Sequence, residues 1–382
     1  MPGRRPPDAV DKRLNGDAAQ ELPDRTKGKT MNVNHSGVHG SAQTPPGKLF
    51  ITGGSGYVGR NLIRHFLSQG MAVAALVRSD AAAATVQALG AEARRGDLHD
   101  PDMARHMQGC ALLVHAAADT NHGWGDAAQR RTNVDGTRHV FASARRAGIK
   151  RAVHLSTESV LLTGQPLVNA DETHPLPRRA AGSYGSTKAE AERIALQSAA
   201  QDFEVMAVRP RFVWGRDDTT ALPQLAKAAA TGQLAWIDGG RYMTSVTHIA
   251  NLCHGVALAL LRGRAGETYF LADAAPVVFR EFVTDLLATQ GIAAPEKTVP
   301  RWVVRGAAAA GDALARLSSG KIALPIGLQQ YAAMAVEVTL DTRKAREELG
   351  YAPVIDRSAG MAELRRHVTA AQARTVQIQR DR

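Results

Sequence analysis

A glycine-rich turn between a short apolar strand and an amphipathic helix is the feature that most constrains the fold of this 382-residue chain. The strand pattern KLFIT runs into TGGSGYVG, which places Gly53, Gly56 and Gly59 at GxxGxxG spacing. Glycines there allow a sharp turn, a close approach of the backbone to a pyrophosphate and tight packing of the helix on the sheet. The helix N-terminus adds free N–H groups and a positive dipole end. The turn therefore predicts a dinucleotide site at Gly53, Gly56, Tyr57, Val58 and Gly59.

Apolar strand patterns alternate with helical stretches in the part of the chain that follows this turn. MAVAALVR, ALLVHAAA, RAVHLST and FEVMAVRP are the strand patterns, and a helical stretch over 126–147 is closed by Gly148. This rhythm predicts an α/β fold with a Rossmann-type doubly wound parallel sheet. After Trp214 the rhythm loosens into short strands and Ala-rich helices, which predicts a smaller C-terminal substrate-binding lobe.

The composition divides the chain into three parts. The beginning is polar and rich in Pro and Gly, so it is predicted to be a disordered extension, or sequence upstream of a start at Met31. The end is basic and is predicted to be a solvated tail. The predicted parts are the extension 1–46, the extended main unit 47–364 and the basic tail 365–382. Within the main unit the predicted core is about 47–215 with parts of 240–275, and the lobe is mainly 216–239 and 276–364.

The formal net charge of +11 is concentrated at the two ends of the chain. Residues 1–48 hold eight Lys/Arg against five Asp/Glu, and residues 357–382 hold six Arg against two acids. No basic run is interleaved with aromatic residues, so a nucleic-acid partner is not expected. No run of about 20 apolar residues occurs, so no transmembrane segment is expected.

The two cysteines bear on the compartment. Cys110 and Cys253 lie in the apolar contexts GCALLV and NLCHG, and they have no metal-ligand spacing. They do not form a disulfide framework, which fits a reducing compartment. The sequence therefore predicts a cytoplasmic protein without a metal site.

A tyrosine and a lysine on one predicted helix are the candidate catalytic pair. In SYGSTKAEAERIAL, Tyr184 and Lys188 are four residues apart, which puts both side chains on one helix face. Phenol is a poor acid–base group at neutral pH until a cation such as the Lys188 ammonium favours phenolate, so Tyr184 can then exchange a proton with a substrate during hydride transfer. Thr157, at the end of the strand RAVHLST, can orient the reacting oxygen. Ser156 is the neighbouring candidate, and strand alternation allows only one of the two to serve.

The end of the second strand bears on the choice of cofactor. An acidic residue there binds the ribose 2′-hydroxyl of NAD and repels a 2′-phosphate. This chain has Arg78 and Ser79 in that region, and arginine suits a 2′-phosphate by its charge and its forked donors. NADP(H) is therefore favoured over NAD(H), and an ordinary surface arginine is the alternative interpretation of Arg78.

These residues lie within a series of motifs that resembles a known family. The sequence resembles the extended short-chain dehydrogenase/reductase family and, within it, the 3β-hydroxysteroid dehydrogenase/isomerase branch of the NAD-dependent epimerase/dehydratase type. The resemblance runs from about Leu49 to about Leu364. Its motifs are TGGSGYVG, GDL, HAAA, TNVDGT, HLSTESV, YGSTK, VRPRFVWG and LDTRKAREELGY. It implies an NAD(P)-dependent enzyme with Thr157, Tyr184 and Lys188 as its catalytic triad.

The resemblance also implies roles around the cofactor. Asp97 and Leu98 would lie at the adenine, and Ala116 and Ala117 would line the cofactor. Asn133 would support the site. Turn and cap chemistry is an equal alternative for Asp97 and Asn133.

Further implied positions lie at the nicotinamide and on the substrate side. Arg211 belongs to the VRPRFV segment beside the nicotinamide, and Glu158, Trp214 and His248 are the expected substrate contacts. Arg211 and Trp214 stand where relatives more often have a small or apolar residue and a tyrosine.

The predicted function is hydride transfer between the nicotinamide and a hydroxyl or keto group of a hydrophobic substrate, a sterol, a steroid or a β-keto lipid. The first alternative is a nucleotide-sugar epimerase or dehydratase; dehydratases follow the triad threonine with two carboxylates, whereas this chain has Glu158 and Ser159. The second is a non-catalytic NADP-sensing protein, which typically lacks the tyrosine or the lysine.

Two further features have competing interpretations. The stretch 300–317 is either a peripheral membrane-contacting helix or a helix that packs over the substrate cleft, and the second is favoured because Ala and Gly add little membrane affinity. His115 and His154 are predicted to be packing residues, since neither has a carboxylate partner or metal spacing. Dimerisation through the long helices is implied by the resemblance.

Overall fold

The computed structural model describes residues 47–120, 127–318 and 326–380. The predicted extension 1–46 lies outside these residues. The last helix, α12 (Arg357–Arg380), crosses the predicted boundary between the main unit and the basic tail.

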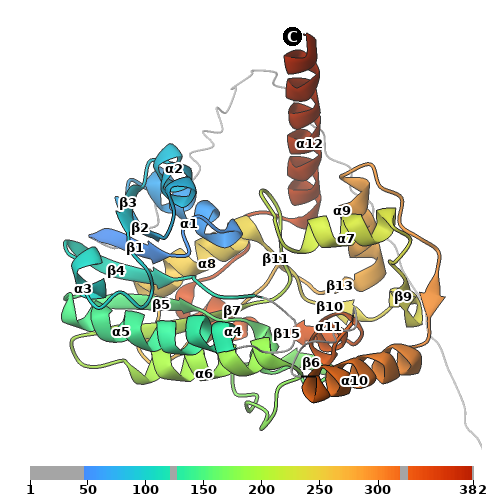
Figure 1. Cartoon of the computed structure of the whole chain (residues 1–382), viewed down its shortest axis with the longest axis horizontal. Coiled ribbons are helices and arrows are strands. Elements are labelled where there is room, and N and C mark those ends of the chain that lie inside the picture. Colours follow the sequence, from blue (N-terminus) through green and yellow to red (C-terminus); the bar gives the residue numbers. More distant parts are fainter. Residues whose placement is uncertain (1–46, 121–126, 319–325, 381–382) are drawn as a thin grey trace, which may run out of the picture. The chain divides into compact units, whose positions relative to one another are not determined.

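A parallel sheet of seven strands forms the centre of the fold (Figure 1). Its strands lie in the order β12-β7-β5-β4-β1-β2-β3, and every adjacent pair is parallel. Their bounds are β1 Lys48–Thr52, β2 Val73–Val77, β3 Glu92–Arg95, β4 Cys110–His115, β5 Arg151–Leu155, β7 Glu204–Pro210 and β12 Thr268–Leu271. This arrangement confirms the predicted Rossmann-type sheet, in which the carboxyl ends of the strands carry the ligand site.

Helices cover both faces of this sheet. Successive strand residues point to opposite faces, so each buried strand contributes side chains to a core on either side. On one face, Leu49 and Ile51 of β1 share a core cluster with residues of α1 (Tyr57–Ser68) and α8 (Ile249–Arg262). On the other face, Phe50 packs in a second cluster with residues of α5 (Gly136–Arg146) and with Ala195 of α6 (Ser183–Gln197). The helices α1 and α6 therefore hold the glycine turn and the candidate triad against the same sheet.

The smaller lobe has its own sheet of four strands in the order β13-β10-β15-β6. Its strands are β6 Leu167–Ala170, β10 Met243–Thr244, β13 Val277–Val278 and β15 Val338–Leu340. Strand β6 comes from within the range predicted for the core, so the lobe draws on an earlier segment than expected. Two short pairs complete the strands, β8 (Val213–Trp214) with β11 (Thr247–His248) and β9 (Trp236–Ile237) with β14 (Thr298–Val299).

The remaining helices flank these sheets (Figure 1). They are α2 Asp80–Ala88, α3 Met103–His106, α4 Ala127–Arg130, α7 Ala221–Ala230, α9 Phe279–Ala288, α10 Arg301–Leu317 and α11 Leu328–Met334. Within the described ranges, no helix combines the length and the apolarity that crossing a membrane requires.

Candidate active site

The backbone of the glycine turn leaves no room for a side chain at two of its glycines. Gly53 has φ of +73°, and a Cβ there would lie 2.7 Å from the backbone nitrogen of Ala117. A Cβ at Gly59 would overlap the carbonyl oxygen of Gly53. The Gly56 N–H donates to that same carbonyl at 3.1 Å, which closes the turn. Glycine at these positions therefore lets the loop after β1, the loop after β4 and helix α1 come together.

The N-terminus of α1 points its first N–H groups out of this turn. Gly56 is its extended N-cap residue, and no side chain caps the helix. Tyr57 is buried in the core cluster and burial raises the pKa of its phenol, whereas Val58 is half-buried. Tyr57 therefore offers the site its backbone N–H, while its ring packs in the core. An uncapped helix end of this kind suits an anionic phosphate.

Arg78 directly follows β2 and is exposed. In the part of the chain that the structure describes, its guanidinium has no hydrogen bond or ion pair. Ser79 caps α2, since its hydroxyl accepts from the N–H of Ala82 at 3.2 Å. Arg95 ends β3 beside Val77 and forms an ion pair of 2.7 Å with exposed Asp80, so a second arginine lies at this sheet edge.

The predicted adenine contacts lie after β3. The Asp97 carboxylate accepts from the N–H of His99 at 3.0 Å, which is the turn contact of the alternative interpretation. Leu98 is buried and packs close to Gly136 at the start of α5. Contact of either residue with adenine stays a prediction.

A buried histidine fixes the loop that contains Ala116 and Ala117. His115 has Thr52 Oγ1 at 2.7 Å from Nδ1 and Thr137 Oγ1 at 2.9 Å from Nε2. Burial lowers the pKa of His115 to about 3, so the ring is neutral. Thr137 donates its own proton to the carbonyl of Asn133 at 2.6 Å, so it must accept from His115 Nε2–H. Thr52 therefore donates to Nδ1 and accepts from the N–H of Ala117 at 3.2 Å.

Asn133 joins this loop to the helix that carries the candidate triad. Its side chain accepts from the N–H of Asp119 at 2.7 Å and donates to the Asp119 carbonyl at 3.0 Å. It also donates to the hydroxyl of Thr187 on α6 at 3.1 Å. Asn133 is buried, and these contacts agree with the predicted supporting role.

The structure brings Thr157 and Tyr184 together. Thr157 follows β5, and its hydroxyl lies near enough to the half-buried Tyr184 phenol at the start of α6 to affect the pKa of that phenol. Burial and the nearby Glu158 carboxylate raise the pKa of Tyr184, and the Thr157 hydroxyl offsets part of this rise. The hydroxyl of Ser156 is buried and has no hydrogen-bond partner among the described residues. Thr157, rather than Ser156, therefore reaches the phenol.

Lys188 lies one helical turn after Tyr184 and is buried. Its ammonium donates to the Leu155 carbonyl at 2.7 Å, and the Nε2 atom of His154 lies 3.4 Å away. Burial lowers the pKa of Lys188 to about 8, and Glu192 opposes this shift. Lys188 is thus a buried amine one helical turn from Tyr184, with a proton that it loses more readily than an exposed lysine.

A buried ion pair adjoins Thr157. Glu158 accepts from the Thr157 hydroxyl at 2.7 Å with one carboxylate oxygen and from Arg211 at 2.8 Å with the other. Arg211 also donates to Thr244 Oγ1 at 3.0 Å and to the carbonyl of Ala333 at 2.8 Å. Burial lowers the pKa of Arg211, and Glu158 opposes this shift. The Arg211 side chain is therefore bound to the lobe, a pairing that no local sequence pattern indicates.

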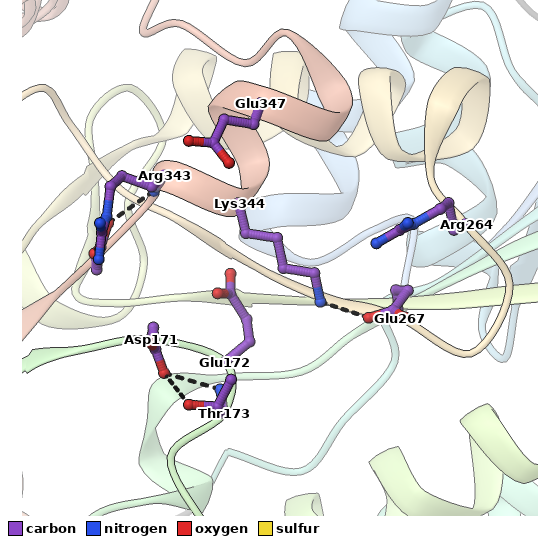
Figure 2. A pocket seen from close by; sticks show the side chains of 9 residues that line it. Asp171, Glu172, Thr173, Arg264, Glu267, Arg343, Lys344 and Glu347 are labelled. Carbon is purple, nitrogen blue, oxygen red and sulfur yellow. Dashed lines mark hydrogen bonds and ion pairs between the residues drawn. The ribbon is translucent and has the colours of Figure 1, made fainter.

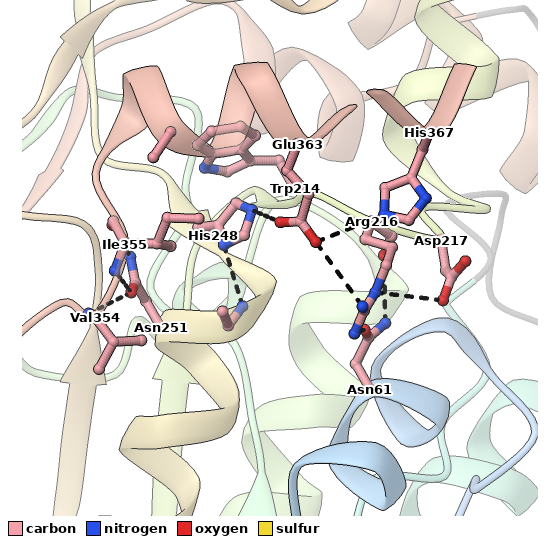
Figure 3. A network of polar contacts seen from close by, with 12 residues as sticks. Asn61, Trp214, Arg216, Asp217, His248, Asn251, Val354, Ile355, Glu363 and His367 are labelled. Atoms are coloured by element: carbon pink, nitrogen blue, oxygen red, sulfur yellow. Dashed lines mark hydrogen bonds and ion pairs between the residues drawn. The ribbon is translucent and has the colours of Figure 1, made fainter. Parts of the chain in front are cut away.

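Trp214 and His248 lie in a different buried network (Figure 3). Trp214 Nε1 donates to Asp273 at 2.9 Å, and its ring packs edge-on against His248 at 4.6 Å between centroids. His248 accepts from the N–H of Ala250 at 3.2 Å and caps α8. Burial lowers the pKa of His248 to about 4, so its ring is neutral beside Glu363 of α12. These two predicted substrate contacts lie against α12 and Asp273 rather than against Thr157 and Tyr184.

A cavity of about 430 Å³ lies elsewhere on the molecule (Figure 2). Its lining is mostly charged: Asp171, Glu172, Thr173, Arg264, Glu267, Asp341, Arg343, Lys344 and Glu347. None of these residues belongs to the predicted site, and a charged lining does not suit a hydrophobic substrate.

A family model and several named proteins match most of this chain. Residues 50–301 match the model of the 3-beta hydroxysteroid dehydrogenase/isomerase family. The chain is 48% identical over 326 residues to the 4-hydroxy-2-methyl-3-oxo-4-farnesyl-3,4-dihydroquinoline-1-oxide ketoreductase of Stigmatella aurantiaca, covering 85% of this chain and 98% of the relative. It is 31% identical over 349 residues to the 3 beta-hydroxysteroid dehydrogenase/Delta 5→4-isomerase of Mycobacterium tuberculosis, covering 85% and 90%. These relatives are named as a reductase and a dehydrogenase, in agreement with the predicted oxidoreductase.

Solved structures share the fold. The crystal structure of gox2253 aligns with a TM-score of 0.68 at 27% identity over 84% of this chain and 99% of its own. The dTDP-glucose 4,6-dehydratase DesIV of Streptomyces venezuelae aligns with a TM-score of 0.65 at 24% identity over 84% and 96%. The chain belongs to the 3-beta hydroxysteroid dehydrogenase/isomerase family, the branch of extended short-chain dehydrogenases/reductases that its motifs predicted.

Proposed function

We propose that this enzyme reduces or oxidises a carbonyl or hydroxyl group of a hydrophobic substrate, with NADP(H) as its cofactor and Thr157, Tyr184 and Lys188 as its catalytic residues. The observation that carries the proposal is the placement of the Thr157 hydroxyl near the Tyr184 phenol, with the buried Lys188 one helical turn further along α6. These three groups lie at the carboxyl end of β5 and on the helix beside it, where open α/β sheets bind their ligands.

The residues of the turn fit a dinucleotide. The uncapped N-terminus of α1 and the side-chain-free Gly53 and Gly59 leave room for a pyrophosphate against backbone N–H groups. Ala116 and Ala117, held close to Gly53, would line the same cofactor. When bound, the nicotinamide supplies or accepts the hydride.

The side chains of the site account for the accompanying proton. In ketone reduction the Tyr184 phenol donates its proton to the substrate oxygen, and the Lys188 ammonium stabilises the phenolate that remains. The Thr157 hydroxyl donates to Glu158 at 2.7 Å and accepts from the N–H of Ser159 at 3.2 Å. To hydrogen-bond a substrate carbonyl, the Thr157 proton must turn away from Glu158.

Two arginines support the preference for NADP(H). Arg78 is exposed and has no partner in the described part of the chain, and Arg95 lies on the neighbouring strand end. A 2′-phosphate at this edge would meet both guanidinium groups, whereas no acidic side chain follows β2 until Asp80. Asp80 already pairs with Arg95.

The names of the relatives support a hydrophobic substrate. The Stigmatella aurantiaca relative is named for a farnesyl-bearing quinoline oxide, and the Mycobacterium tuberculosis relative for a steroid. A sterol, a steroid or a β-keto lipid is the substrate class that we propose. A sugar dehydratase is disfavoured because Glu158 is paired with Arg211 and Ser159 stands at the second carboxylate position.

The exposed surface of helix α10 bears on the surroundings of the enzyme. Helix α10 buries Val304 and Ala308 in the core cluster that contains Val160 and Leu161, and its other face is mainly apolar and exposed, with Trp302 at 77% and Leu317 at 86% exposure. That exposed face suits peripheral contact with a lipid surface. A homodimer and a cytoplasmic location stay predictions from the sequence.

A panel assay tests this function. The purified chain is mixed with NADPH or NADH and, in turn, with a 3-ketosteroid, a β-keto acyl ester, a prenylated quinolone and a UDP-sugar, and cofactor oxidation is followed by absorbance. The proposal expects NADPH oxidation with at least one hydrophobic ketone. Epimerisation or dehydration of a UDP-sugar consumes no cofactor overall, so the UDP-sugar is instead followed by chromatography, and no conversion is expected. No oxidation with any hydrophobic ketone, together with turnover of the UDP-sugar, would contradict it.

A further inference from the structure

Two neighbouring residues of the strand β5 hold the Lys188 ammonium. Its Nζ donates to the Leu155 carbonyl at 2.7 Å, and the Nε2 atom of His154 lies 3.4 Å from Nζ. His154 is completely buried, and only a few per cent of Lys188 is exposed. An ammonium group has donors and no acceptor, so His154 Nε2 must accept the hydrogen bond.

This contact determines which nitrogen of His154 carries the proton. Burial, Lys188 and His115 together hold the pKa of His154 well below its ordinary value, so the ring is neutral. With Nε2 as an acceptor, the proton lies on Nδ1, which has no hydrogen-bond partner within the described ranges. A buried donor without a partner is unfavourable. His154 thus differs from its neighbour His115, whose two nitrogens are both hydrogen-bonded.

We propose that His154 is a positioning residue of the proposed reaction: its Nε2 lone pair holds the Lys188 side chain on β5 and keeps that lysine charged beside Tyr184. The proposal rests on the proposed function, because the charge of Lys188 matters to the reaction only where Tyr184 transfers a proton.

The other titratable groups that face Lys188 do not replace this acceptor. Tyr184 and Glu192 come from α6 itself, and His115 comes from β4. The Glu192 carboxylate is bound on both oxygens by the buried Arg209 of β7, at 2.8 and 2.5 Å. Its attraction for Lys188 is therefore shared with a second cation, while His154 and the Leu155 carbonyl are in direct contact.

The proposal predicts a change in the pH dependence of the reaction. Phenylalanine at position 154 would fill a similar volume without an acceptor, so the Lys188 ammonium would lose its proton at a lower pH. A neutral lysine no longer stabilises the Tyr184 phenolate, so ketone reduction would slow on the alkaline side at a lower pH than in the native enzyme. At pH values below this alkaline decline, the variant and the native enzyme would reduce the ketone at similar rates.

The experiment compares the full-length enzyme with His154→Phe, His154→Gln and Phe141→Leu. Glutamine keeps an oxygen acceptor, and Phe141 packs against His154 with ring centroids 6.0 Å apart, so the last variant disturbs the same packing without removing the acceptor. The value of kcat is measured from pH 6 to pH 10 with NADPH and the ketone of the panel that reacts fastest.

His154→Phe is expected to move the midpoint of the alkaline limb down by about one pH unit. His154→Gln and Phe141→Leu are expected to keep the native midpoint. An unshifted midpoint in His154→Phe, with kcat lowered equally at every pH, would show a structural role only and overturn the proposal. If His154→Phe does not fold, the proposal is tested on His154→Gln. A downward shift of about one pH unit in the alkaline midpoint of that variant would also overturn the proposal.

The activity of the native enzyme on the ketone panel distinguishes a failure of this inference from a failure of the proposed function. A native enzyme that reduces no ketone of the panel contradicts the proposed function. A native enzyme that is active, with a midpoint that His154→Phe leaves unchanged, contradicts the role of His154 alone.

Discussion

The Glu158 carboxylate lies 2.8 Å from the Arg211 guanidinium, and both side chains are buried. Glu158 also accepts from Thr157, whereas Arg211 donates to Thr244 of β10 and to the Ala333 carbonyl of α11. The ion pair therefore links the candidate triad to two segments of the smaller lobe. The contribution of this ion pair to stability depends on both partners, since removing one leaves the other charge buried without compensation.

The variant Arg211→Met is expected to lower the free energy of unfolding by about 3–5 kcal/mol, because Glu158 then stays buried without its cation. Urea denaturation followed by fluorescence measures the change. The double variant Glu158→Gln with Arg211→Met is expected to recover part of the loss. The control is Arg105→Ala, which removes an exposed ion pair with Asp102. If Arg211→Met were as stable as this control, the assignment would be contradicted.

Gly59→Ala is expected to abolish tight binding of NADPH, because its Cβ would overlap the Gly53 carbonyl and push α1 away from the turn. Fluorescence titration of NADPH measures the affinity. Gly306→Ala is the matched control: it lies on α10 and its Cβ would meet nothing within 4 Å. The control is expected to bind NADPH normally and to gain up to about 1 kcal/mol of stability. Equal affinity in both variants would argue against a cofactor at this turn.

Arg78→Ala is expected to weaken NADPH binding by about 10–100-fold, the contribution of a charge-assisted hydrogen bond to a phosphate. Binding of NADH, which lacks the 2′-phosphate, is expected to change by less than about threefold. Parallel titrations with the two cofactors give both numbers. A similar loss for both cofactors would mean that Arg78 does not select NADP(H).

The strand-to-helix turn and the placement of the candidate triad on its elements were predictable because each depends on local backbone geometry. Glycine spacing determines a strand-to-helix turn, and four residues on a helix place Tyr184 beside Lys188. The family resemblance supplied Thr157, and the structure places its hydroxyl near the Tyr184 phenol.

Contacts between distant segments were not predictable in the same way. His154 faces Lys188 because of how α6 packs on β5, and Arg95 lies at the edge beside Arg78 because of the register of β2 and β3. Periodicity indicates which face of an element is buried, but not which polar group it meets there. For the same reason the sequence did not indicate that Trp214 packs edge-on against His248 and donates to Asp273.

Buried neutral histidines are expected to make the fold sensitive to acid. Burial lowers the pKa of His115 to about 3 and that of His248 to about 4, below the ordinary 6.5. The unfolded chain therefore binds more protons below pH 6.5, so stability is complete above that pH and falls as the pH drops towards 4. The expected slope is about 1.4 kcal/mol per pH unit for each such histidine.

Urea denaturation between pH 8 and pH 5 measures this slope. His248→Asn is expected to reduce it, because asparagine keeps an acceptor at the N-cap of α8 and removes the titrating ring. The exposed His174 is the control, and His174→Gln is expected to leave the slope unchanged. A slope that His248→Asn does not alter would contradict a neutral buried ring.

The variant Tyr184→Phe tests the central claim most directly, with kcat for NADPH oxidation measured on the ketone that the native enzyme reduces fastest. Loss of the phenolic proton donor is expected to lower kcat by about 10²–10⁴-fold. The affinity for NADPH is expected to stay within about threefold of the native value, because the turn is intact. Native turnover in Tyr184→Phe would contradict the assignment of Tyr184 as the residue that transfers the proton.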